Sequence, residues 1–194
     1  MTVEITRRGS SVIAARATIA QDGQIKTTAA ALFAKPRDDR WDFDHSEAPQ
    51  VPGPDEVNTV PWNPLFPRFA VHYDYKFCVG QIPFSGHEDG HVGGWCRLKE
   101  SAVPADAGQI AALLDIWPPA MLTRVESPTA AATISWQLIF HRALPLINAE
   151  PDDYYLVDAR STHTSAGYAS AQASLFTEEG LLLAESMQLV TIFG

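Results

Sequence analysis

Only one stretch of this sequence has the spacing of an α-helix, and it constrains the fold more than any other feature. Between Ile110 and Trp117 the apolar residues recur at helical intervals, and Pro118-Pro119 ends the pattern. Strands are predicted before it, at residues 69–79 and from 94 onwards, and after it, at residues 133–141, 154–162, 167–176 and 181–193. The sequence therefore predicts an α+β protein with one apolar helix among strands.

The first 67 residues contain a β-hairpin and a proline-rich acidic segment. Residues 12–20 and 25–33 are predicted to pair, because Asp22-Gly23 supplies the positive φ angles of a tight turn. Seven of the 14 prolines fall in residues 36–67, a density that prevents a regular helix or central strand. The same segment carries the acids Asp38, Asp39, Asp42, Asp44, Glu47, Asp55 and Glu56. We interpret residues 37–67 as a surface linker between residues 1–36 and 68–194.

Charge and composition exclude several classes of protein. With 23 acidic against 14 basic residues, the formal charge is -9, which disfavours nucleic-acid binding because that needs a basic face. No charged-then-apolar leader opens the chain, and no apolar run reaches about 18 residues, so we expect no membrane association and a cytoplasmic protein. Cys78 and Cys96 are expected to be reduced thiols in this compartment.

Familiar catalytic motifs are missing or misplaced. The run from His87 to His91 matches the zinc-protease pattern H-E-x-x-H, but that chemistry needs both imidazoles on one helix. Glycines surround the run, which predicts an exposed turn between strands, and we predict no metal site. The sequence also has no G-x-S-x-G elbow and no glycine loop for nucleotide phosphates, so neither a covalent serine hydrolase nor a dinucleotide cofactor is expected.

Asp115 is the polar residue that stands out. It lies at the edge of the apolar helix stripe with Ala111 and Ala112 one turn away, so partial burial could raise its pKa. A solvated aspartate near a helix end is an equally good interpretation. Thr133 and Gln188 are ordinary strand residues when taken singly. Aligning the hairpin around Gly180 with that around Gly23 places Ala31 opposite Gln188, as in a duplicated β-unit.

At these positions the sequence resembles the type II, or TesB-like, acyl-CoA thioesterases, which carry two hot-dog units in one chain. In a hot-dog fold an antiparallel sheet wraps around a central helix. The resemblance rests on five segments in the order of the family: Arg8-Gly9-Ser10, Leu113-Leu114-Asp115, Ala132-Thr133-Ile134, Phe140-His141-Arg142 and Gln188. It covers the second unit, residues 68–194, and the closing strands of the first, residues 1–36. The chain departs from the family pattern at Leu189-Val190 and at Ala143.

The resemblance implies hydrolysis of acyl-CoA to a free acid and CoA, with no cofactor. Asp115 would be the general base, and Thr133 and Gln188 would hold the attacking water. It also implies an N-terminally truncated first unit, and hence a homo-oligomer or pairing with a chain that supplies the missing helix. The alternatives are a non-catalytic acyl-CoA or acyl-chain binding module and a subunit of a two-chain thioesterase. A hydratase is disfavoured, because no histidine lies near Asp115 in the helix-to-strand segment. Candidates for binding the CoA phosphates are Arg97, Arg142 and Arg160.

Overall fold

The computed structural model describes residues 1–37, 41 and 43–193. The chain divides into two compact units, Met1–His45 and Ser46–Gly194. Three acids of the predicted linker, Asp38, Asp39 and Asp42, lie outside the described residues. The predicted domain boundaries at residues 36 and 67 stay a prediction.

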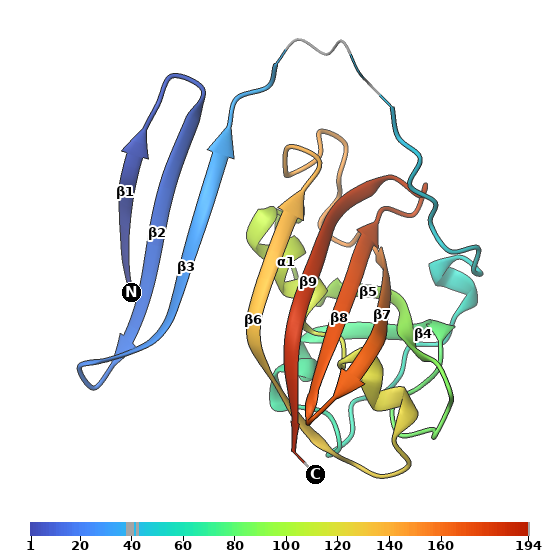
Figure 1. Cartoon of the computed structure of the whole chain (residues 1–194). Helices are drawn as coiled ribbons and strands as arrows, with labels where there is room; N and C mark the ends of the chain where they lie inside the picture. The colour runs from blue at the N-terminus through green and yellow to red at the C-terminus, as the bar shows by residue number, and fades with distance from the viewer. Residues whose placement is uncertain (38–40, 42, 194) are drawn as a thin grey trace. The chain divides into compact units, whose positions relative to one another are not determined.

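The first unit is a three-stranded antiparallel sheet, drawn in blue in Figure 1. Its strands β1 (Thr2–Arg8), β2 (Val12–Gln21) and β3 (Gln24–Ala34) follow one another in space as they do in sequence. Asp22 and Gly23 have φ angles of 53° and 75°, the left-handed values that a two-residue hairpin turn requires. The predicted hairpin is confirmed.

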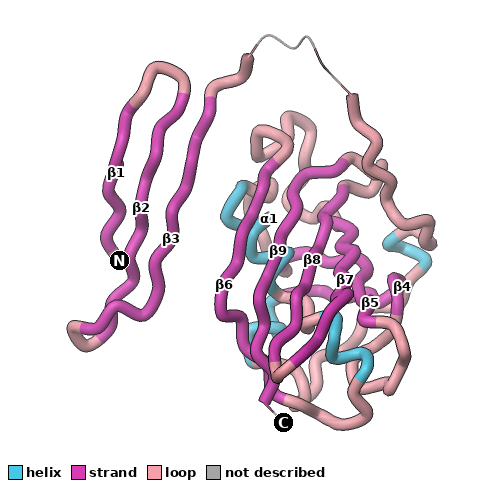
Figure 2. Tube along the Cα trace, in the orientation of Figure 1, coloured by secondary structure: helices cyan, strands magenta, loops and turns pink. Residues whose placement is uncertain are grey.

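The second unit is a six-stranded antiparallel sheet packed on one helix (Figures 1 and 2). The spatial order is β4-β5-β7-β8-β9-β6, so the last strand along the chain lies beside the first strand after the helix. The strands are β4 (Tyr73–Gly80), β5 (Gly90–Leu98), β6 (Ala130–Phe140), β7 (Tyr155–Ser165), β8 (Tyr168–Phe176) and β9 (Leu182–Phe193). All six strands were predicted.

The start of β4 is one place where the sequence prediction was wrong. A strand was expected from Phe69, but Arg68–His72 forms a 3-10 helix. The amide of Ala70 donates to the carbonyl of Pro67 at 3.0 Å, and Ala70 is buried. Alternation of apolar and polar residues cannot distinguish one such turn from the first residues of a strand.

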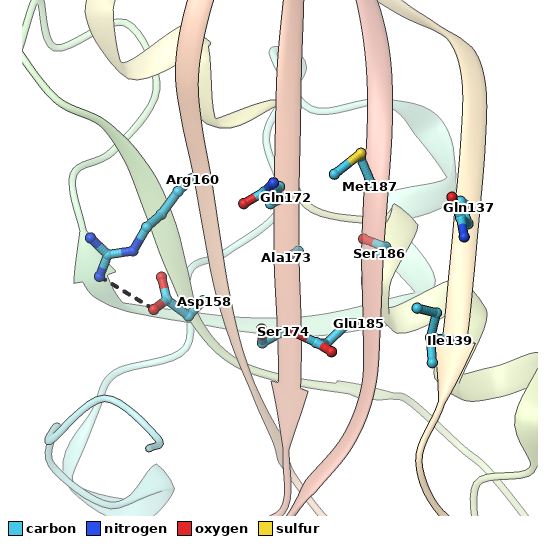
Figure 3. Close-up of a pocket in the computed structure, with 10 residues that line it drawn as sticks. All are labelled: Gln137, Ile139, Asp158, Arg160, Gln172, Ala173, Ser174, Glu185, Ser186 and Met187. Carbon is cyan, nitrogen blue, oxygen red and sulfur yellow. Dashed lines mark hydrogen bonds and ion pairs between the residues drawn. The ribbon is translucent and has the colours of Figure 1, made fainter. Parts of the chain in front are cut away.

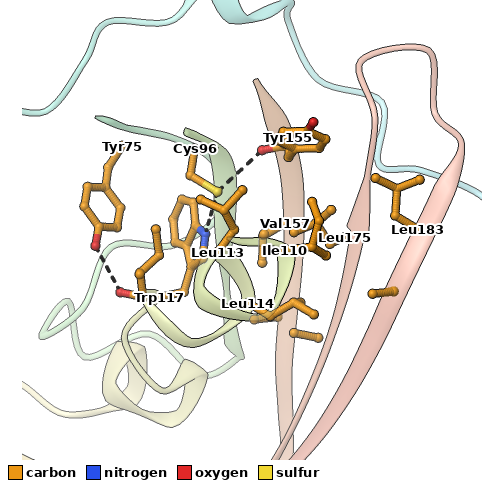
Figure 4. Packing of buried hydrophobic residues seen from close by; sticks show 14 of the residues in the cluster. Tyr75, Cys96, Ile110, Leu113, Leu114, Trp117, Tyr155, Val157, Leu175 and Leu183 are labelled. Atoms are coloured by element: carbon orange, nitrogen blue, oxygen red, sulfur yellow. Dashed lines mark hydrogen bonds between the residues drawn. The ribbon is translucent and has the colours of Figure 1, made fainter. Parts of the chain in front are cut away.

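The described residues form one α-helix, α1 (Ala107–Asp115), which ends two residues before Trp117, the last apolar residue of the predicted stripe. The Asp106 side chain caps it by accepting from the amide of Gln109 at 2.9 Å. Ile110, Leu113 and Leu114 are buried against the sheet, as Figure 4 shows. Their spacing puts one face of the helix into the core, so the opposite face and the last residue, Asp115, remain nearer to solvent.

Backbone contacts, not side chains, explain the glycines at the centre of β5. A Cβ atom on Gly93 would lie 2.0 Å from the carbonyl oxygen of Val157 on β7, and one on Gly94 would lie 2.0 Å from that of Lys76 on β4. Neighbouring strands therefore approach closely from both sides. The preceding run from His87 is a turn, as predicted, and His91 already belongs to β5, where its Nε2 lies 2.7 Å from Asp158 Oδ1.

Part of the predicted linker is packed on the second unit. The Trp95 indole donates to the carbonyl of Pro52 at 2.8 Å, and the amide of Val60 donates to Tyr75 O at 2.8 Å. Lys76, which is buried, donates to the carbonyl of Pro54. The carbonyl groups of two prolines thus accept from side chains of the sheet, and the Val60 amide donates to a sheet carbonyl, which explains how a segment without regular structure is held in place.

Candidate active site

A β-bulge in β6 determines which of its side chains face the helix. Thr133 is paired with Val190 and Ser135 with Leu189, with a register shift between them. Val190 is fully buried on the helix side of β9, so Thr133 lies on that side too. Because the bulge adds one residue, Trp136 also faces inward, which strict alternation from Thr133 would not allow.

The end of α1 meets β9 through a direct contact between two of the three predicted site residues. Gln188 Nε2 donates to Asp115 Oδ1 at 3.1 Å. Gln188 is half-buried and lies two residues from Val190, on the same inner face of β9. Asp115 is the last residue of the helix. Two residues that are 73 positions apart are therefore joined by the packing of helix on sheet.

Burial raises the pKa of Asp115 above its usual value near 3.8, and the hydrogen bond from Gln188 opposes that shift. The raised pKa makes this carboxylate more basic than an ordinary aspartate. A carboxylate in that state can accept a proton from a water molecule as a bond forms to the water oxygen.

Thr133 is placed by strand register alone. It is exposed, and it lies opposite Val190, two pairs along the sheet from the Trp136–Gln188 pair. Paired residues of an antiparallel sheet have Cβ atoms about 4.5–5.5 Å apart and diagonal neighbours about 7–8 Å apart. The hydroxyl of Thr133 and the amide of Gln188 therefore border the same part of the inner face.

Buried side chains fix the end of α1 where Asp115 lies. The Tyr75 hydroxyl donates to the carbonyl of Ile116 at 3.2 Å, and the Trp117 indole donates to Cys96 Sγ at 3.4 Å (Figure 4). The rings of Tyr75 and Trp117 also meet edge to face, with centroids 5.6 Å apart. Sequence reasoning missed these supports, because an aromatic residue in a strand indicates only that a core exists.

A small cavity of about 20 Å³ lies beside Gln188, between the segment after α1 and the inner face of the sheet. Its lining includes Leu114, Trp117, Ala120, Ala171, Ser186 and Gln188. That volume is about the size needed for one water molecule, and Ser186 and Gln188 offer polar atoms to it. The cavity can therefore hold a water next to Gln188, the residue that donates to Asp115.

A larger groove of about 360 Å³ lies on the opposite face of the sheet and contains none of the predicted catalytic residues. Figure 3 shows Asp158 and Arg160 of β7 beside Gln172 and Ser174 of β8. Arg160 lies 3.4 Å from Asp158, and Arg97, another candidate for CoA phosphates, lies 3.0 Å from Asp74. Both guanidinium groups thus already have carboxylate partners.

Comparison with known proteins shows what the chain as a whole is similar to. Residues 44–192 match the family model of the acyl-CoA thioesterase C-terminal domain. No curated protein matches the chain. A protein of unknown function with a hot-dog fold from Alicyclobacillus acidocaldarius is 25% identical, with a TM-score of 0.84 over 99% of this chain and 72% of that one.

Two further solved structures are similar. A proposed thioesterase from Novosphingobium aromaticivorans is 23% identical, with a TM-score of 0.79 over 100% of this chain and 72% of that one. The acyl-CoA thioesterase II TesB2 from Mycobacterium marinum is 20% identical, with a TM-score of 0.71 over 98% of this chain and 72% of that one. The predicted α+β hot-dog fold is confirmed. No helix among the described residues is long and apolar enough to cross a membrane.

Proposed function

This chain belongs to the family of acyl-CoA thioesterase C-terminal domains, a family of thioester hydrolases, and we propose that it hydrolyses an acyl-CoA to a free acid and CoA by direct attack of water. The observation that carries the proposal is the hydrogen bond between Gln188 and Asp115. It joins a basic carboxylate to an amide at the end of a helix, beside a cavity large enough for one water.

In this proposal Asp115 is the general base. A water oxygen forms a bond to the thioester carbonyl carbon while the Asp115 carboxylate takes one of its protons. The tetrahedral oxyanion then collapses, the carbon–sulfur bond breaks, and the CoA thiolate leaves and takes up a proton. Gln188 donates to Asp115 through its nitrogen, and its amide oxygen can accept a hydrogen bond from the same water. Thr133 is proposed as a further hydrogen-bonding partner of that water.

The two thiols of the chain support attack by water instead of by cysteine. Burial raises the pKa of Cys96 to about 12, and it also raises the pKa of Cys78. At neutral pH both are therefore protonated, and a protonated thiol is a poor nucleophile. Cys96 is fully buried, and its Sγ accepts from Trp117, which is a structural role.

The proposal is tested by following thiol release from acyl-CoAs of short, medium and long chain length. We expect turnover of at least one class by the wild-type protein. Tight binding of acyl-CoAs with no thiol release would contradict the proposal and favour the alternative of an acyl-CoA binding module. The chain-length profile would also show which acyl groups the site accepts.

Replacing Gln188 with alanine should shift the pH dependence of turnover. The hydrogen bond from Gln188 lowers the pKa of Asp115, so its loss raises that pKa further. Because the base must be ionised, activity rises with pH through the pKa of Asp115. The acidic limb of the kcat/KM profile is therefore expected at higher pH in Gln188→Ala than in wild type. An unshifted limb would show that Gln188 does not act on Asp115.

We also propose that the first unit pairs with a second chain. The register of β1, β2 and β3 places Val3, Ile5 and Phe33 on one face, where they are 64%, 52% and 61% exposed. The same face also carries Ile13, Ala15, Ala17, Ile19, Ala29 and Ala31, with the polar residues Arg8 and Thr27 towards its ends. In the second unit, the inner face of β8 and β9 includes the Ala171–Gln188 pair, and α1 covers this face.

This pairing is tested by light scattering coupled to size exclusion. Because an apolar sheet face of this kind needs a cover, we expect a homo-oligomer or a complex with a chain that supplies a helix. A protein that stays monomeric at every concentration, alone and with its candidate partner, would contradict the proposal.

A further inference from the structure

Trp136 lies at the predicted site but was not among the residues that the sequence pointed to. It is paired with Gln188 across β6 and β9, so the two side chains are direct neighbours on one face of the sheet. Its ring is partly buried and packs against the core that holds α1. The bulge after Thr133 is what turns it inward, and Gln188 in turn contacts Asp115.

The indole nitrogen of Trp136 is buried and has no hydrogen-bond partner among the described residues. Three other tryptophans donate a hydrogen bond from the indole nitrogen to an acceptor in the protein. Trp95 donates to Pro52 O at 2.8 Å, Trp117 to Cys96 Sγ at 3.4 Å, and Trp62 to Pro67 O at 3.4 Å. Leaving a donor unpaired in the interior costs about 1–3 kcal/mol, so such a group in a folded protein calls for a reason.

The place of Trp136 beside Gln188 and Asp115 offers an explanation for the unpaired N–H. An indole N–H can only donate, and hydrolysis of a thioester develops negative charge on the carbonyl oxygen. A donor that is fixed by packing and shielded from water stabilises such a charge without having to reorganise. We propose that the Trp136 Nε1–H donates a hydrogen bond to the thioester carbonyl oxygen and to the oxyanion that forms from it. This inference rests on the proposed thioesterase function.

The substitution Trp136→Phe replaces the indole with a smaller apolar ring and removes the donor. We expect kcat to fall about 10²- to 10³-fold with KM little changed, the range seen when one oxyanion donor is removed. Stability should fall only by the cost of the smaller ring, because the N–H has no protein partner to lose. A role in packing alone would leave kcat of the folded variant close to wild type, which would overturn the proposal.

Two control variants distinguish loss of the Trp136 N–H donor from the general effects of removing a buried polar atom or an indole. Ser161→Ala removes the other buried polar side-chain atom that has no partner among the described residues, and kcat should not change. Trp95→Phe removes an indole N–H that is paired with Pro52, so we expect lower stability with kcat retained. Equal losses of kcat in Trp136→Phe and in either control would also overturn the proposal.

A second measurement works without any variant. A ketone analogue of acyl-CoA, in which a methylene separates sulfur from the carbonyl, cannot be hydrolysed but keeps the carbonyl oxygen. On binding, the indole N–H resonance of Trp136 should move downfield in the NMR spectrum, while those of Trp95 and Trp117 stay. An unmoved Trp136 resonance with the analogue bound would refute the proposal. Failure of the wild type to hydrolyse any acyl-CoA would instead refute the proposed function.

Discussion

The substitution Asp115→Asn is expected to lower kcat for acyl-CoA hydrolysis by about 10²- to 10⁴-fold, the usual contribution of a positioned general base. Asparagine keeps an oxygen that can accept the hydrogen bond from Gln188, so the geometry at the end of α1 should persist. It cannot take a proton from water. Thiol release under saturating acyl-CoA measures the effect, and circular dichroism shows that the variant is folded.

The same variant should not lose stability. Because burial raises the pKa of Asp115, the folded state favours the protonated form, and the stability tied to this group falls as pH rises through its folded pKa. At a pH above that folded pKa, where the carboxylate carries its charge, removing the charge relieves that cost. We therefore expect Asp115→Asn to have a Tm at or above that of wild type at pH 7.

A matched control is Asp152→Asn, which changes an exposed aspartate of the same unit. It should keep both kcat and Tm. If Asp115→Asn turned over at the wild-type rate, Asp115 would not be the base. If it were inactive only because it unfolds, Tm and the circular dichroism spectrum would show this directly.

The second large effect is expected in the core beneath the site. Leu113 of α1 is 2% exposed, and its truncation to alanine leaves a cavity between the helix and the sheet. We expect a loss of about 2–5 kcal/mol in the free energy of unfolding, measured by urea denaturation. Because α1 carries Asp115 at its end, the activity of the folded fraction should also fall.

The control for this variant is a leucine of the same unit that is not packed. Leu65 is 72% exposed, and Leu65→Ala should change the free energy of unfolding by less than about 0.5 kcal/mol. Similar losses in Leu113→Ala and Leu65→Ala would mean that α1 is not held in the core as described.

The helix and strands of this fold could be predicted because their patterns are local. Four apolar residues at helical spacing identify α1, and Asp22-Gly23 identifies the hairpin turn without any knowledge of the remaining chain. The close contacts at Gly93 and Gly94 depend on which strands lie on either side of β5. Strand order is a property of the whole sheet, so those glycines could not be explained from sequence.

The site could be predicted only in part, for the same physical reason. Resemblance to a family pointed to Asp115, Thr133 and Gln188, and the structure adds the contact between the first and the last. Trp136 was missed because alternation from Thr133 assigns it to the outer face. One extra residue in the bulge reverses that assignment, and bulges have no reliable sequence signal.

In the proposed mechanism, water positioned by Asp115 and Gln188 attacks the thioester carbonyl itself. A single turnover in H₂¹⁸O with enzyme in excess tests it most directly, using mass spectrometry on the product acid and on the peptide that contains Asp115. We expect one ¹⁸O atom in every molecule of acid and none in the peptide. Unlabelled acid together with ¹⁸O on Asp115 would show an acyl-enzyme anhydride and contradict direct attack.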